Sequence, residues 1–142
     1  MEQSRFEVEV ERRVPVTADQ AWEILATARG FQKMFPGIRV EGDWRQGGQV
    51  TWSGEWEGKT FRDEATILEY RAPKLFSYSY WTSFAGLPNL PENCQTITCS
   101  FDAVTDGTKV TIRQTNILTQ ESRDHSEKNW AEVLAGISAP LD

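Results

Sequence analysis

The feature that most constrains this chain is a change of hydrophobic period along its length. From residue 38 to residue 118, apolar residues recur at every second position between turn-forming residues, as half-buried antiparallel strands require. Residues 18–28 and the segment after residue 120 instead repeat at intervals of three and four, as amphipathic helices do. A further alternating run, FEVEVERRV, covers residues 6–14. The sequence therefore predicts one strand, two helices, five or six strands and one long helix, in that order.

Capping and helix-stopping residues set the expected bounds of the helices. Thr17 and Gln20 have the spacing of a capping box at the start of the first helix, and we expect Gly30 to end that helix. FQKMFPG, residues 31–37, then predicts a single helical turn. Pro140 is expected to end the last helix, because proline cannot continue one.

Turn residues define the strands and one long connection. Asp106-Gly107 predicts a type I′ hairpin turn, in which both central residues have positive φ. The segment 82–93 carries a glycine and two prolines, so it cannot continue a strand ladder. A connection of this length is expected to be either a lid over a binding site or a plain surface excursion.

Length and charge argue against several classes of partner. A chain of 142 residues is long enough to bury one sizeable core, so we expect a single domain over residues 1–142. Its net charge of −6 is spread along the chain, which argues against nucleic acid or an anionic membrane as a partner. The start has no apolar signal segment, and no run approaches the ~20 apolar residues of a membrane span. We therefore expect a cytoplasmic protein.

The residue content gives little support to metal or cofactor chemistry. His125 is the sole histidine, and we expect it to be an exposed residue near the start of the last helix. Cys94 and Cys99 fall in one predicted strand with opposite facings, where they can neither form a disulfide nor bind zinc together. We therefore expect two reduced thiols, no metal site and no cofactor.

Aromatic residues are concentrated on the predicted strands. Trp44, Trp52 and Trp56 lie within the short Gly-rich segment 44–61, and the inward positions of the strands carry more apolar surface than one helical stripe can cover. We expect these rings to line an internal cavity; the alternative is that they fill a large curved core. The candidate ligand-binding residues are Trp52, Trp56, Phe61, Asp63, Tyr78, Tyr80, Phe101, Gln114 and Trp130.

Two polar residues follow the inward alternation of the strands. If Ala65 and Ile67 face inward, so does Asp63, and desolvation raises the pKa of an inward carboxyl unless it is paired. Asp63 is therefore the candidate for acid–base catalysis or ligand anchoring, with a water-exposed place at the strand end as the alternative. Gln114 could supply a neutral hydrogen bond inside the cavity, or could lie at its rim.

Four segments stand in one order along nearly the whole chain: VERRVPVTADQAWEILATARGFQKMFPG, GDWRQGG, FRDEATILEYRAPKLFSYSYW, and TKVTIRQTNILTQES followed by NWAEVLAGI. In this order they resemble the activator of heat-shock protein 90 ATPase homologue family, a branch of the START-like (SRPBCC) superfamily. The resemblance implies an α+β helix-grip fold. In that fold a curved seven-stranded antiparallel sheet wraps around a long C-terminal helix, and two short helices follow the first strand.

The resemblance also implies a class of function. Members of the superfamily bind lipids, hormones and other hydrophobic metabolites, so the leading expectation is a carrier, sensor or sequestration protein for a small hydrophobic or aromatic molecule. One alternative is a cavity enzyme of the cyclase, dehydratase or hydrolase type, or one that protects against a reactive natural product. Another is a chaperone-related protein-interaction module, whose protein partner the sequence does not identify.

Overall fold

The structure is a computed structural model that describes residues 5–83 and 86–141. The first half of the chain holds β1 (Phe6–Val14), α1 (Ala18–Leu25), α2 (Ala28–Met34), β2 (Arg39–Gly42), β3 (Gln49–Trp56) and β4 (Lys59–Arg71). The second half holds β5 (Leu75–Thr82), the short 3-10 turn η2 (Pro91–Asn93), β6 (Gln95–Val104), β7 (Gly107–Ile117) and α3 (Gln120–Ala135).

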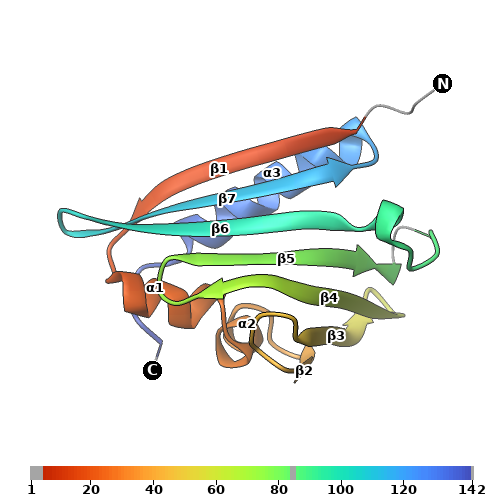
Figure 1. The fold of residues 1–142 in the computed structure, drawn as a ribbon, viewed down its shortest axis with the longest axis horizontal. Helices are drawn as coiled ribbons and strands as arrows, with labels where there is room; N and C mark the ends of the chain where they lie inside the picture. Colours follow the sequence, from red (N-terminus) through yellow and green to blue (C-terminus); the bar gives the residue numbers. More distant parts are fainter. Residues whose placement is uncertain (1–4, 84–85, 142) are drawn as a thin grey trace.

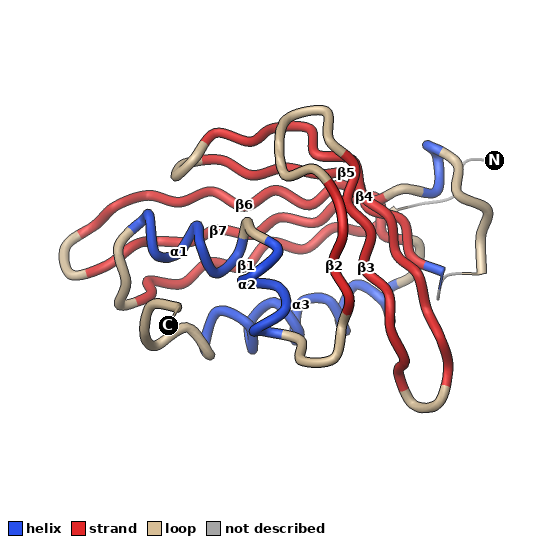
Figure 2. Tube along the Cα trace, turned by 90° about the horizontal axis from the view of Figure 1, so that it is seen from below, coloured by secondary structure: helices blue, strands red, loops and turns tan. Residues whose placement is uncertain are grey.

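The seven strands form one antiparallel sheet in the order β1-β7-β6-β5-β4-β3-β2 (Figure 1). In Figure 1, α3 runs behind β1 and β7, and it packs on both. The helix α1 packs on β6 and β7, and α2 packs on β2. Figure 2 shows β2 and β3 running across the direction of the other strands, so the sheet curves around the helices. The predicted α+β helix-grip arrangement is confirmed.

The capping box that opens α1 is confirmed, but the predicted end of that helix is wrong. The main-chain N–H of Gln20 donates to Thr17 Oγ1 at 3.2 Å, and that of Thr17 donates to Gln20 Oε1 at 2.9 Å. The helix ends at Leu25, and Thr27 opens α2 by accepting from the N–H of Gly30 at 3.1 Å. Gly30 therefore lies inside α2, because a second cap restarts the helix before the glycine is reached.

The hairpin between β6 and β7 is confirmed, but its turn is displaced by one residue. Val104 pairs with Gly107, so the central residues are Thr105 and Asp106, of which Asp106 has a φ of +59°. Gly107 instead closes the turn, where an added Cβ would lie 2.2 Å from a carbonyl oxygen of β1. The glycine is therefore needed for close approach of two strands as well as for the turn.

The alternation along β4 sets which face of the sheet is inward. Asp63, Ala65 and Ile67 are buried, whereas Arg62 is exposed and Glu64 is partly exposed. The inward facing predicted for Asp63 is therefore confirmed. Side chains from every layer meet in the core, including Val14, Trp22, Leu25, Phe31, Val50, Ile67, Phe76, Ile97, Phe101, Ile112 and Leu134.

The two cysteines are free thiols, but they do not share a strand. Cys99 is buried within β6, and Cys94 is half-buried just before that strand begins. Burial raises the pKa of the Cys99 thiol to about 12. Because its thiolate is scarce at neutral pH, Cys99 behaves as a small apolar core residue.

Gly30 offers a test of how closely α1 and α2 pack. A Cβ at this position would lie 2.1 Å from the Ile24 carbonyl oxygen and 2.4 Å from that of Glu23. Because these are main-chain atoms, we expect Gly30→Ala to lower the free energy of unfolding by about 3 kcal/mol, measured by urea denaturation. Gly136→Ala is the control, since its Cβ would meet Glu132 at an ordinary 3.4 Å; it should change stability by no more than about 1 kcal/mol. Equal effects of the two substitutions would contradict this account.

Candidate functional site

Trp44 and Trp52 of the Gly-rich segment lie in a cluster of aromatic rings beside α2. The rings of Trp44 and Trp52 are 6.4 Å apart, and both contact Phe31 of α2, at 5.6 and 5.2 Å. Trp52 also contacts Tyr78 and Tyr80, at 5.8 and 6.1 Å. The rings that we expected to line an internal cavity therefore pack against one another here. At this end of the sheet the alternative holds, in which they fill a curved core.

The two best-formed hollows among the described residues lie away from this ring cluster. One, of about 150 Å³, lies on the outer face of the sheet and is lined by Thr51, Glu64, Thr66, Ser79, Asn89 and Cys94. The other, of about 420 Å³, is lined by Glu11, Arg12, Arg13, Val104 and Lys109. Neither has a lining residue from α3, so neither is the cavity that we expected between that helix and the sheet.

Asp63 and Tyr80 form a polar pair on the inward face, next to the ring cluster. The hydroxyl of Tyr80 donates to Asp63 Oδ2 at 2.6 Å, and the main-chain N–H of Ser83 donates to Oδ1 at 3.3 Å. Trp52 lies opposite Asp63 across β3 and β4. Asp63 is 7% exposed and is the one charged residue among the buried residues of the described chain.

The surroundings of this pair favour its protonated forms. Burial raises the pKa of the Asp63 carboxyl. Hydrogen bonds from Tyr80, Thr82 and the Ser83 main chain lower it again, but by less. Burial and the nearby charge of Asp63 raise the pKa of the Tyr80 hydroxyl well above its ordinary value. A carboxyl in this setting can hold its proton at a pH where an exposed aspartate has lost it, which suits a proton donor or a ligand anchor.

A chain of side-chain hydrogen bonds runs from α3 toward this pair. The indole N–H of Trp130 donates to Gln114 Oε1 at 2.8 Å, and Gln114 Nε2 donates to Gln95 Oε1. Gln95 lies directly opposite Tyr80 across β6 and β5, so both side chains point to the same face. Asp63, Tyr80, Gln95, Gln114 and Trp130 thus form what we call the polar row, which spans four neighbouring strands and α3.

The indole N–H of Trp52 lacks an acceptor beside the polar row. Trp52 is 5% exposed, and none of the described residues accepts a hydrogen bond from its Nε1. A buried donor without a partner costs about 1–3 kcal/mol, so most buried donors in native proteins have one. This N–H can therefore donate to an acceptor that the described residues do not supply.

Sequence reasoning missed Gln95 and Asn116, which shape the same end of the sheet. Near the start of β1, that strand advances by two residues while β7 advances by three, so β7 contains a bulge. Asn116 lies in the bulge with a φ of +66°, a conformation that asparagine tolerates. Its amide donates to the carbonyls of Glu92 at 3.2 Å and Cys94 at 2.8 Å. Asn116 thereby fastens η2, at the end of the long connection, beside the polar row.

The other predicted site residues are not brought to the polar row or are not described. Phe101 packs against Trp22 of α1 at 5.4 Å, and it lies six residues along β6 from Gln95, or about 20 Å. Phe61 is half-buried near the start of β4. The side chain of Trp56 lies outside the described part of the chain, as do residues 84–85 of the long connection. Both alternatives for this connection, a lid and a plain surface excursion, therefore stay predictions.

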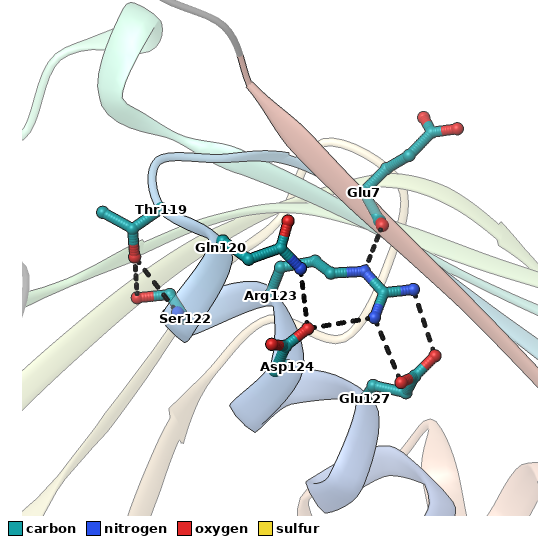
Figure 3. Close-up of polar contacts among 7 residues, drawn as sticks. All are labelled: Glu7, Thr119, Gln120, Ser122, Arg123, Asp124 and Glu127. Atoms are coloured by element: carbon teal, nitrogen blue, oxygen red, sulfur yellow. Dashed lines mark hydrogen bonds and ion pairs between the residues drawn. The ribbon is translucent and has the colours of Figure 1, made fainter.

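The first half of α3 is attached to β1 by polar contacts (Figure 3). Arg123 Nε donates to the carbonyl of Glu7 at 3.1 Å, and both terminal nitrogens of Arg123 donate to the Glu127 carboxylate at 3.1 Å. His125 is exposed, as expected. The buried residue of α3 is Leu134, so the apolar packing of this helix is concentrated in its second half.

Within residues 5–83 and 86–141, no three side chains of the His, Cys, Asp and Glu types are grouped so that they could hold a metal ion. In the same part of the chain, no helix has both the length and the apolar character needed to cross a membrane.

Known proteins share this fold and its C-terminal helix. Residues 15–142 match the family model of the activator of Hsp90 ATPase homolog 1-like protein. The solution structure of ChR145 from Cytophaga hutchinsonii is 32% identical, with a TM-score of 0.82 over 97% of this chain and 94% of that one. A comparison with curated protein sequences finds no match.

More distant structures agree in fold alone. The Aha1 dimer from Colwellia psychrerythraea is 15% identical, with a TM-score of 0.73 over 94% of this chain and 93% of that one. Ara h 8.0201 is 17% identical, with a TM-score of 0.75 over 94% of this chain and 95% of that one. At these identities the side chains of the polar row need not be shared.

The raised pKa of Asp63 predicts a pH dependence of stability. The folded state holds the Asp63 proton more tightly than the unfolded state, where the pKa is near the ordinary 3.8. Stability from this group is therefore highest at low pH and falls as pH rises from about 4 through the folded pKa. Asp63→Asn removes this fall. The free energy of unfolding of the variant, minus that of the wild type, should therefore increase as the pH rises across the same window.

Urea denaturation from pH 4 to pH 7 measures this difference, and Glu64→Gln, which changes the adjacent outward carboxyl, is the control. The explanation fails if the wild type and Asp63→Asn keep a constant difference across the window.

Proposed function

Because the chain belongs to the activator of Hsp90 ATPase homolog 1-like family, we propose that it binds a small, ring-bearing hydrophobic molecule on the inward face of the sheet, beside the polar row. The observation that carries this proposal is the indole N–H of Trp52, which is buried and has no acceptor among the described residues. It lies where aromatic rings and the polar row meet, which is the mixed lining that small-molecule sites use.

The ring cluster supports an aromatic or alicyclic ligand. Trp52 and Tyr80 meet edge to face, with their ring centres 6.1 Å apart. A flat ligand ring that replaces this contact gives each side chain a new ring partner, and each such contact contributes about 0.5–1.5 kcal/mol beyond the buried area. The contacts with the ligand ring therefore offset much of the contact energy that is lost when the rings of Trp52 and Tyr80 separate.

The polar attachment of α3 supports a route into the site. Arg123 holds the first half of α3 to β1. None of the described residues in that half is buried, because the buried residue of α3, Leu134, lies in its second half. Segments with few buried apolar contacts open at low free-energy cost. Movement of this half of α3 would therefore expose the inward face near Trp130 while the core beneath α1 stays packed.

Binding of an apolar ring is tested with naphthalene as the probe. We expect saturable binding by calorimetry, together with a shift of the Trp52 indole N–H signal in proton–nitrogen correlation NMR. Ala65 faces inward opposite Tyr80, so Ala65→Val should fill the site and weaken binding about tenfold, or about 1.4 kcal/mol.

Thr66→Val is the matched control, because Thr66 is the next residue of β4 and faces outward. It should leave the affinity within about twofold. The proposal is lost if naphthalene gives no saturable response, or if the shifted signals come from residues far from Trp52 while Ala65→Val binds as well as the wild type.

The Asp63–Tyr80 hydrogen bond favours a second candidate, a hydrolase that uses the same site. At a pH above its raised pKa, the ionised Asp63 would act as the general base, a role worth about 10²–10⁴-fold in rate. With naphthyl acetate as the substrate, Asp63→Asn should lower the hydrolysis rate by about 100-fold and Glu64→Gln should not. Equal rates for the wild type and Asp63→Asn would rule out this role.

A further inference from the structure

The hydrogen bonds of the polar row have a fixed direction. An indole N–H can donate but cannot accept, so Trp130 must meet the oxygen of the Gln114 amide, as it does at 2.8 Å. The nitrogen of that amide is left to donate to the oxygen of Gln95. Gln95 uses its amide oxygen in this bond, so its own NH₂ group is turned away from Gln114.

Two hydrogen-bond donors, the NH₂ of Gln95 and the indole N–H of Trp52, thus border the same rings. Gln95 is the cross-strand neighbour of Tyr80, and the ring of Tyr80 contacts the ring of Trp52. Trp52 supplies the second donor, its buried Nε1. Because both groups donate, they match a ligand that accepts hydrogen bonds.

The charges around the site disfavour an anionic ligand. Asp63 is the charged residue among the buried ones described. When ionised it would repel a second carboxylate, and when protonated it supplies no positive charge to offset one. Arg123, seven residues before Trp130 on α3, is already paired with Glu127 and Asp124. A buried carboxylate without a cation has a large desolvation cost, so the accepting atom should belong to a neutral group.

Building on the proposed function, we propose that the site takes a neutral ring-bearing molecule by a hydrogen-bond-accepting oxygen, such as the carbonyl of a ketone, quinone or lactone. Trp130 acts through Gln114 as a positioning residue that keeps the N–H groups of Gln95 available to that oxygen. The Trp52 indole N–H is the second donor to the same ligand.

Three naphthalene derivatives of one shape test the ligand class: the methyl ketone, the isopropenyl analogue in which CH₂ replaces the oxygen, and naphthoate. We expect the ketone to bind about tenfold more tightly than the isopropenyl analogue, and naphthoate to bind more weakly than either. The Trp52 indole and Gln95 side-chain amide signals should move downfield with the ketone and not with the hydrocarbon.

Substitutions within the row test the positioning role. Gln95→Met removes the donors and should abolish the preference for the ketone while the affinity for the hydrocarbon stays within about twofold. Trp130→Phe should shift the side-chain amide signals of Gln95, although Gln95 bonds to Gln114 and not to Trp130. Trp81→Phe is the matched control, because the Trp81 indole donates to Leu87 at 3.0 Å outside the polar row; it should leave the Gln95 signals in place.

The outcomes separate this inference from the proposed function. Equal binding of the ketone and the hydrocarbon, tighter binding of naphthoate, or a ketone preference that survives Gln95→Met would overturn the inference and leave ring binding standing. Unchanged Gln95 signals in Trp130→Phe would overturn the positioning role. If none of the three probes binds saturably, both the inference and the proposed function are wrong.

Discussion

The inward face of a seven-stranded sheet has to be covered, and α3 packs mainly on the two strands at one edge, β1 and β7. The remaining strands are covered by α1, α2 and large aromatic side chains that extend from the strands themselves. Trp44 and Trp52 contribute to this covering through contacts with Phe31 and with other rings of the strands. The bulk of these residues is thus a requirement of curvature, since small aliphatic side chains would leave the bend unfilled.

Fold and chemistry are carried by different residues in this chain. The family expected from the order of the sequence segments is confirmed, and proteins that are 15% or 17% identical share the architecture. The residues of the polar row cannot be inferred from the fold, because a fold of this kind supports many activities. Trp130 is half-buried on α3, yet the direction of its N–H determines which way two amides on the sheet must point.

Much of the fold was predictable because alternation and capping are local. The facing of Asp63 followed from its neighbours along β4, and the box at Thr17 followed from spacing. Pairing across strands is not local, so Gln95 was missed. Its place in the site depends on its strand partner Tyr80 and its hydrogen-bond partner Gln114, which lie 15 and 19 residues away in the sequence. The bulge at Asn116 was missed for a related reason, because one extra residue in an alternating run leaves no clear mark in the pattern.

The contact between Arg123 and the Glu7 carbonyl also affects how the molecule meets its neighbours in solution. Open sheets end in strands whose unpaired main-chain groups can recruit a strand from another molecule. At one edge strand, β1, the Glu7 carbonyl already accepts a hydrogen bond from the Arg123 side chain, and glutamates alternate along the strand. The other edge strand, β2, is four residues long. A protein with so many aromatic rings on its strands is thereby protected against joining its sheets into aggregates.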